Sequence, residues 1–145
     1  MTAASIVSFG HRAIGQIMKR ILIIDDDADI RRTVAETFRQ AGFEVVTAGD
    51  GKQGMALFRS QAFELVITDL IMPRQDGFQT IKSIRRLQPD LRIIAISGGE
   101  PAVTAKYLKA VAQHTAVTRV LIKPFTMDQL LETANNLLSG GEHAD

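Results

Sequence analysis

The sequence has no cysteine, only three histidines, no surplus of charge and no long apolar run. The absence of cysteine excludes disulfides and thiolate metal sites. The histidines, His11, His114 and His143, are scattered and lack the spacing of metal ligands. The formal net charge of +1 does not favour a nucleic-acid or membrane surface, and no apolar run is long enough to cross a bilayer. We therefore expect no nucleic-acid partner and no membrane partner.

The composition is that of one folded domain. The chain has 145 residues, of which 46% are hydrophobic and 23% charged, which is enough for a sizeable core. We predict a domain over residues 20–139, with tails over residues 1–19 and 140–145. The first tail has no acidic residue and no secretory signal pattern. We interpret it as a flexible end or an upstream start, because Met18 would itself begin a compact domain. The alternative is a short docking helix that uses Ile6, Phe9, Ile14 and Ile17.

Strand-like and helix-like patterns alternate from Arg20 onwards. The strand patterns are apolar and β-rich, and they cover residues 21–24, 43–47, 63–68, 91–96 and 119–122. A helix pattern follows each of them, and the helix after the fourth strand is predicted from Pro101 to about His114. Asp27, Asp50 and the pair Thr126 and Gln129 are predicted N-terminal caps, and Gly54 weakens the second helix pattern. The alternation predicts an α/β fold, a parallel sheet with helices on both faces.

Four of the predicted strands end in a residue that can do chemistry. Asp25 and Asp26 follow the first strand, Asp69 the third, Ser97 the fourth and Lys123 the fifth. Because parallel strands present their carboxyl ends at one edge of a sheet, these side chains can share one crevice. Crowded carboxylates need a proton or a cation, and Mg²⁺ is the common choice for oxygen ligands. A carboxylate beside Mg²⁺, a lysine and a hydroxyl is arranged to accept a phosphoryl group, with Asp69 as the nucleophile.

The same residues lie in four motifs that occur in a fixed order. The motifs are residues 21–27, Asp69-Leu70-Ile71-Met72-Pro73 with Asp76-Gly77 behind it, Ile96-Ser97-Gly98, and Lys123-Pro124-Phe125. With these motifs, residues 18–139 resemble the receiver domain of bacterial two-component response regulators, in its stand-alone form. The resemblance implies a flavodoxin-like (βα)5 fold, a doubly wound parallel five-stranded sheet with the strand order 2-1-3-4-5.

The resemblance also implies a role for each site residue. Asp69 is the expected phosphoacceptor, Ser97 the switch hydroxyl and Lys123 the lysine of the site. Mg²⁺ is expected on Asp25, Asp26 and Asp69, together with the backbone carbonyl of Ile71. The Lys123–Pro124 peptide bond is expected to be cis. We interpret Asp76-Gly77 as an ordinary turn without a catalytic role.

The implied function is that of a cytoplasmic phosphoprotein in two-component signalling. It would take a phosphoryl group from a histidine kinase or a histidine phosphotransfer protein. It would then bind a downstream protein through the face formed by the fourth helix, fifth strand and fifth helix. We expect a phosphoacceptor and not a turnover enzyme.

Two features depart from the family pattern. The family often has an aromatic residue three positions before the lysine, where this chain has Val120. The interval from Ser97 to Lys123 is long, which suggests a longer loop at the fourth helix.

Two other functions stay open at the level of sequence. A receiver-like scaffold that is never phosphorylated is slightly favoured by Val120, whereas the complete set of site residues opposes it. A Mg²⁺-dependent phosphatase with an aspartyl intermediate would need a second acid two residues after the nucleophile, and that position is Ile71. A dinucleotide-binding fold is disfavoured because the turn after the first strand is acidic and lacks G-x-G-x-x-G.

Overall fold

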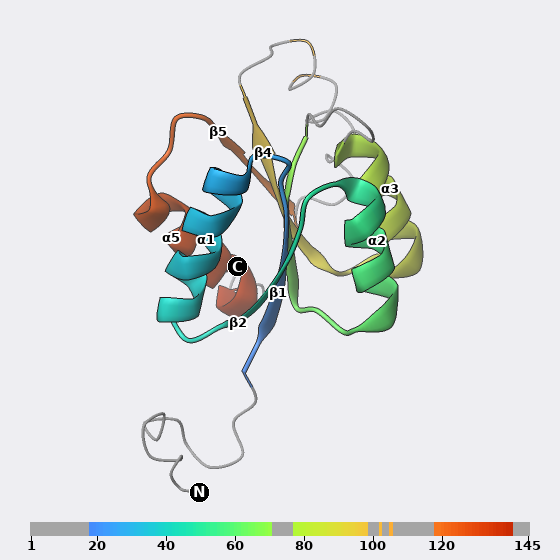
Figure 1. Cartoon of the computed structure of the whole chain (residues 1–145), viewed down its shortest axis with the longest axis horizontal. Coiled ribbons are helices and arrows are strands. Elements are labelled where there is room, and N and C mark those ends of the chain that lie inside the picture. Colours follow the sequence, from blue (N-terminus) through green and yellow to red (C-terminus); the bar gives the residue numbers. More distant parts are fainter. Residues whose placement is uncertain (1–17, 71–76, 99–101, 103–104, 106–117, 141–145) are drawn as a thin grey trace, which may run out of the picture.

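The fold is a five-stranded parallel sheet between two helical layers (Figure 1). A computed structural model describes residues 18–70, 77–98, 102, 105 and 118–140. The strands are β1 (Arg20–Ile24), β2 (Glu44–Ala48), β3 (Leu65–Asp69), β4 (Arg92–Ser97) and β5 (Thr118–Ile122). The helices among the described residues are α1 (Ala28–Gln40), α2 (Gly51–Ser60), α3 (Gly77–Leu87) and α5 (Met127–Gly140). The sheet order is β2-β1-β3-β4-β5 with parallel pairing throughout, which confirms the predicted flavodoxin-like arrangement.

Some of the predicted elements differ at their ends or cannot be compared. The predicted fourth helix, from Pro101 to about His114, lies almost wholly outside the described residues, as do residues 1–17 and 141–145. Strands β2 and β4 each begin one residue later than predicted, at Glu44 and Arg92. The amides of the preceding residues are hydrogen-bonded within turns and do not pair with a neighbouring strand. Phe43 N donates to Phe38 O (3.1 Å), and Leu91 N donates to Gln88 O (3.2 Å).

Strand β3 begins at Leu65, two residues later than the predicted start at Phe63. The Phe63 ring is buried and stacks on Phe58 of α2, with the ring centroids 6.3 Å apart. Phe63 therefore packs against α2 in the connection between α2 and β3 and does not take part in the strand. All five residues of β3 are buried, as expected for a strand covered on both faces.

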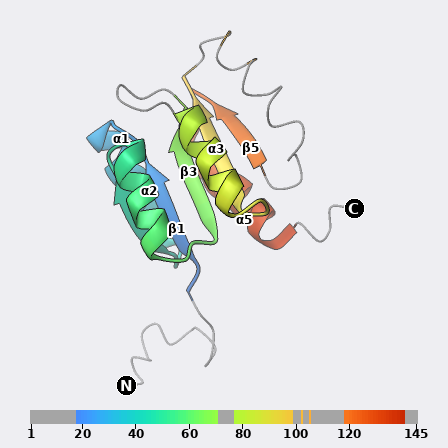
Figure 2. The same cartoon turned by 90° about the vertical axis from the view of Figure 1, so that its right-hand side faces the viewer.

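The two helical layers bury separate apolar clusters on the two faces of the sheet. Helices α1 and α5 cover one face, and α2 and α3 lie side by side over the other (Figures 1 and 2). Alternate residues of β1 point to opposite faces, so that Ile21 and Ile23 pack under α1 and α5 while Leu22 and Ile24 pack under α2 and α3. The two clusters hold the strands in one register, and this register decides which residues meet at the strand ends.

The predicted N-terminal caps are present. Asp27 accepts from the backbone N–H groups of Asp29 and Ile30, and Asp50 accepts from Gln53 N. Thr126 and Gln129 form a reciprocal capping box, with Thr126 N donating to the Gln129 side chain (2.8 Å) and Gln129 N to the Thr126 hydroxyl (3.0 Å). The first cap starts α1 immediately after the acidic residues that follow β1 and so fixes the direction in which the chain leaves the site.

Gly54 lies within α2 at a point where the helix packs very closely on β1. A Cβ atom at Gly54 would lie 2.5 Å from Cδ1 of Ile24. Glycine weakens a helix by roughly 1 kcal/mol relative to alanine. At position 54 the lower helix propensity of glycine is offset by the close contact between α2 and β1 next to Asp25.

Candidate phosphoryl-transfer site

The strand register brings the predicted site residues to neighbouring positions at one edge of the sheet. Ile24 of β1 pairs with Thr68 of β3, so Asp25 and Asp69 are the next residues on adjacent strands. Asp69 pairs with Ile96 of β4, which places Ser97 one step further along. Ser97 in turn pairs with Ile122 of β5, which is followed by Lys123. The residues therefore form an oblique row across four adjacent strands.

Backbone hydrogen bonds continue across the row beyond the strands themselves. Asp25 N donates to Ala48 O (3.1 Å), Leu70 N to Ile96 O (2.9 Å) and Lys123 N to Ser97 O (2.9 Å). The Lys123–Pro124 peptide bond that follows is cis, as expected. Asp25, Asp69 and Lys123 thus sit on backbone that is held by the sheet.

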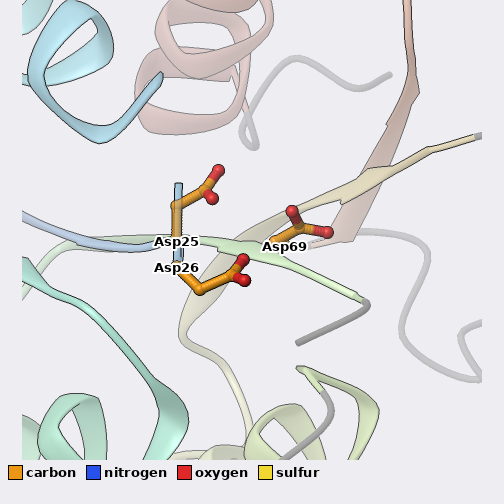
Figure 3. A group of neighbouring side chains, drawn as sticks. All are labelled: Asp25, Asp26 and Asp69. Carbon is orange, nitrogen blue, oxygen red and sulfur yellow. The ribbon is translucent and has the colours of Figure 1, made fainter. Parts of the chain in front are cut away.

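The three acids lie together at the carboxyl ends of β1 and β3 (Figure 3). One carboxylate oxygen from each of Asp25, Asp26 and Asp69 lies within 4.8 Å of the others. Asp25 is 2% exposed and Asp69 7% exposed, whereas Asp26 is exposed. The structure therefore brings together the three carboxylates that the sequence predicted as metal ligands, and Ile71, the fourth predicted ligand, lies outside the described residues.

Asp25 has a perturbed protonation equilibrium. Burial raises its pKa to about 6, and the negative charges of Asp69 and Asp26 act in the same direction. The hydrogen bond that Asp25 accepts from Asp27 N (2.9 Å) and the positive charge of Lys123 lower the pKa and oppose the shift in part. A buried carboxylate with a raised pKa lacks enough positive charge nearby, which is the condition that a bound cation relieves.

The donor set fits a hard divalent cation. All three groups offer carboxylate oxygens, and the exposed Asp26 leaves one side open to water. Mg²⁺ binds oxygen at about 2.1 Å in octahedral geometry and usually keeps several waters, so a few protein ligands are sufficient. The three carboxylate oxygens already lie within 4.8 Å of one another.

Lys123 and Ser97 complete the site on the other side of Asp69. Lys123 Nζ lies 3.8 Å from Asp69 Oδ2, with its side chain 35% exposed and that of Asp69 9% exposed. Ser97 is fully buried as the last residue of β4. Val120 is half-buried on β5 and packs against the cluster under α2 and α3, at the position where the family often has an aromatic ring.

Two residues that help to position the site were not predicted from the sequence. Gly77, interpreted as part of an ordinary turn, approaches the Asp69 carbonyl oxygen so closely that a Cβ atom would overlap it, and its N–H donates to Leu70 O (2.9 Å). Arg31 of α1 donates from Nη1 to Asp25 O (2.6 Å). No sequence signal marks Arg31, whereas a glycine that begins a helix shortly after Asp69 could have indicated a close backbone approach.

Comparisons with known proteins agree with this geometry. A profile of the response regulator receiver domain matches residues 21–135. The response regulator receiver protein CpdR of Brucella abortus is 31% identical over 121 residues, which cover 83% of this chain and 98% of that protein. The chemotaxis protein CheY of Bacillus subtilis is 33% identical over 122 residues, with coverages of 83% and 98%.

Solved structures show the same similarity. Chemotaxis protein CheY4 of Vibrio cholerae superposes with a TM-score of 0.75 at 31% identity, covering 84% of this chain and all of that one. The response regulator TrrA of Thermotoga maritima, solved in complex with Mg²⁺-BeF, superposes with a TM-score of 0.71 at 30% identity and covers 83% of this chain. Within the described residues, no helix combines the length and apolar character needed to cross a membrane.

Proposed function

The chain belongs to the family of response regulator receiver domains, and from this premise we propose that it is a phosphorylation switch with Asp69 as the phosphoacceptor. The observation that carries the proposal is the setting of Asp69. Its carboxylate is almost buried at the end of the central strand, with the Lys123 ammonium 3.8 Å away and two further acids beside it. The proposed donor is the phosphohistidine of a histidine kinase or of a histidine phosphotransfer protein.

In the proposed transfer, a carboxylate oxygen of Asp69 attacks the phosphorus atom. The bond between phosphorus and the histidine nitrogen breaks, the imidazole leaves with the electron pair, and an acyl phosphate forms on Asp69. Lys123 stabilises the charge on the phosphoryl oxygens from its side of Asp69. Mg²⁺, which Asp25, Asp26, Asp69 and the Ile71 carbonyl would hold, supplies the remaining charge neutralisation when bound.

We propose that Ser97 transmits the effect of phosphorylation at Asp69 to a partner-binding surface. A phosphoryl group adds a charge of about −1.5 to −2 and three acceptor oxygens, and the Ser97 hydroxyl would donate to one of them. The Ser97 carbonyl accepts from Lys123 N, so movement of Ser97 is transmitted directly to the end of β5. Ile122 on this edge strand is 50% exposed, which leaves apolar surface for a partner protein.

In this proposal the chain works as a stand-alone receiver in the cytoplasm, acts by binding another protein and does not turn over a substrate. A scaffold without phosphorylation is the second candidate, and the aliphatic Val120 favours it because no aromatic ring there can follow Ser97. A Mg²⁺ titration separates the two, since an ion that binds only the folded chain stabilises it increasingly as the ion concentration rises above the dissociation constant. A scaffold with an inactive site would show no stabilisation by the metal.

The direct test is treatment with Mg²⁺ and acetyl phosphate, followed by mass spectrometry of the intact chain. We expect the wild type to gain the mass of one phosphoryl group and Asp69→Ala to gain none. Asp90→Ala, at an exposed position away from the site, is the matched control and should be labelled like the wild type. No label on the wild type, or equal labelling of Asp69→Ala, would refute the proposal.

A second measurement tests the switch. Amide chemical shifts are compared with and without the phosphoryl group, in the wild type and in Ser97→Ala. We expect wild-type changes to extend from the Asp69 region into β5 and α5, and the Ser97→Ala changes to stay near Asp69. Changes confined to the Asp69 region in the wild type would contradict the proposed route.

A further inference from the structure

Helix α1 and the edge strand β2 enclose a second concentration of charge, outside the site described above. A groove of about 220 Å³ lies between them. We call it the arginine groove, and it is lined by Ala28, Arg31, Arg32, Ala35, Arg39 and Thr47. Three arginines, Arg31, Arg32 and Arg39, thus line a single hollow.

The periodicity of α1 explains how the groove forms. The lining positions of the helix recur every three or four residues from Ala28 to Arg39, which places them on one face. Thr47 lies on the same side of β2 as Val45, whose side chain packs under α1. The two alanines have short side chains that leave the space open, and the arginines surround it.

Among the described residues, two of the three arginines, Arg31 and Arg39, are not paired with an acid. Arg31 donates to Asp25 O (2.6 Å) and Arg39 donates from Nη2 to Val45 O (3.3 Å), both of which are uncharged acceptors. Arg32 pairs with Asp29 at 3.1 Å, but both side chains are largely exposed and such a pair is weak. Within the described part of the chain, no carboxylate lies within ion-pair distance of Arg31 or Arg39.

We propose that the arginine groove binds a small soluble anion of the diphosphate class. A guanidinium has five donors in a planar fork that matches phosphate oxygens, and one carbonyl contact leaves most of these donors available. Arg31 and Arg39 are separated by about 12 Å along the helix axis, so two linked phosphate groups bridge them better than one. The volume is below the range of about 300–1,000 Å³ typical of sites for drug-sized ligands, which favours a small anion.

The proposal does not depend on phosphorylation of Asp69. It is tested by titrating the full chain with inorganic pyrophosphate in a metal-free buffer that contains a chelator, so that no anion can bind through a metal at the three acids. We expect saturable amide shifts at Ala28, Ala35 and Thr47, in the wild type and in Asp69→Ala alike. Shifts that do not saturate, or that are lost in Asp69→Ala, would overturn the assignment.

Arg39→Gln is the main variant, because Arg31 touches the backbone of Asp25 and would disturb the first site. We expect pyrophosphate affinity to fall at least tenfold in Arg39→Gln. Arg59→Gln removes the same charge from an exposed position on α2 and should change affinity less than twofold. An equal loss in both variants would mean that only net charge matters, and the groove would then not be a site.

A third variant distinguishes loss of the binding site from a folding defect in Arg39→Gln. Ala28→Leu fills the groove from its exposed first helical position and keeps all three arginines. Pyrophosphate affinity should again fall at least tenfold, with the thermal midpoint unchanged. Full affinity in Ala28→Leu would show that the anion binds outside the groove and would refute the proposal.

Discussion

Gly77, the first residue of α3, lies against the carbonyl oxygen of Asp69, so closely that no side chain fits between them. Its N–H also donates to Leu70 O (2.9 Å), the carbonyl of the residue that directly follows the central strand. The start of a helix is thus packed directly on the backbone of the candidate phosphoacceptor.

Gly77→Ala is therefore expected to be destabilising and to slow phosphorylation. The new Cβ meets backbone, which cannot move aside as a side chain can, and overpacking of this kind costs about 1–3 kcal/mol. Urea unfolding measures the stability, and labelling by acetyl phosphate, expected to slow about tenfold, measures the site. Gly98→Ala is the matched control, since a Cβ there would meet nothing within 4 Å. Wild-type stability in Gly77→Ala would show that the close approach is not required.

Lys123→Met should weaken phosphoryl transfer while leaving the fold intact. The substitution keeps most of the side-chain length but removes the positive charge 3.8 Å from Asp69. Loss of one electrostatic contact to a developing anion typically costs about 10²–10³ in rate, and we expect the lower end because the lysine is partly solvated. Rates of labelling are compared with Lys52→Met, an exposed lysine on α2. If both variants were labelled at the wild-type rate, Lys123 would have no part in transfer.

Asp25→Asn should change how stability depends on pH. Burial raises the pKa of Asp25 to about 6 from an ordinary value of 3.8, so the folded state holds the proton more tightly than the unfolded state. The unfolding free energy contributed by this group is therefore highest below pH 3.8 and decreases as the pH rises towards 6. Its full loss is about 3 kcal/mol at most. In metal-free buffer, the wild type should lose stability over this range relative to Asp25→Asn.

Urea unfolding from pH 4 to pH 7 measures this difference, with Asp90→Asn as the surface control. Asp25→Asn should be the more stable chain at pH 7 without metal. Saturating Mg²⁺ should stabilise the wild type more than the variant, because the ion favours the charged carboxylate. Parallel pH curves for the wild type and Asp25→Asn would contradict the assigned pKa.

Gly54→Ala should increase the helix propensity of α2 but worsen its packing on β1. Alanine stabilises a helix by roughly 1 kcal/mol relative to glycine, but its Cβ would lie 2.5 Å from the Ile24 side chain. We expect a net destabilisation of about 1 kcal/mol, because Ile24 is fully buried and its neighbours limit its movement. Ile24→Val removes Cδ1, so Gly54→Ala should be tolerated better in that background. A double-mutant cycle from urea unfolding would show a favourable coupling, and additive effects would count against the contact.

The parallel sheet with helices on both faces could be predicted from patterns within short segments, whereas the strand order came only from the resemblance to the receiver family. Apolar runs identified the strands, and Asp27, Asp50 and Thr126 marked helix starts correctly. The strand ends shifted by one or two residues where an amide, such as that of Phe43, is taken by a preceding turn. Such competition depends on three-dimensional geometry that apolar patterns do not encode.

The candidate site could be predicted only as a set of side chains. Asp25, Asp26 and Asp69 were found together because parallel strands place their ends at one edge. The contact of Arg31 with Asp25 O involves a backbone atom and leaves no mark on residue type, whereas the close approach of Gly77 to Asp69 is marked only by the glycine itself. The weak helix signal at Gly54 likewise has its cause in Ile24, thirty positions away in the sequence.

The sheet order places Asp69 on the central strand and Lys123 at the end of an edge strand. A central strand opens only when the whole domain unfolds, whereas an edge strand can open locally. Amide hydrogens of β3, such as that of Ile67, should exchange with solvent at the rate set by global unfolding, and those of β5 should exchange faster. The acceptor is thus attached to a slowly exchanging strand, and the surface that would report its state belongs to an edge strand that exchanges faster.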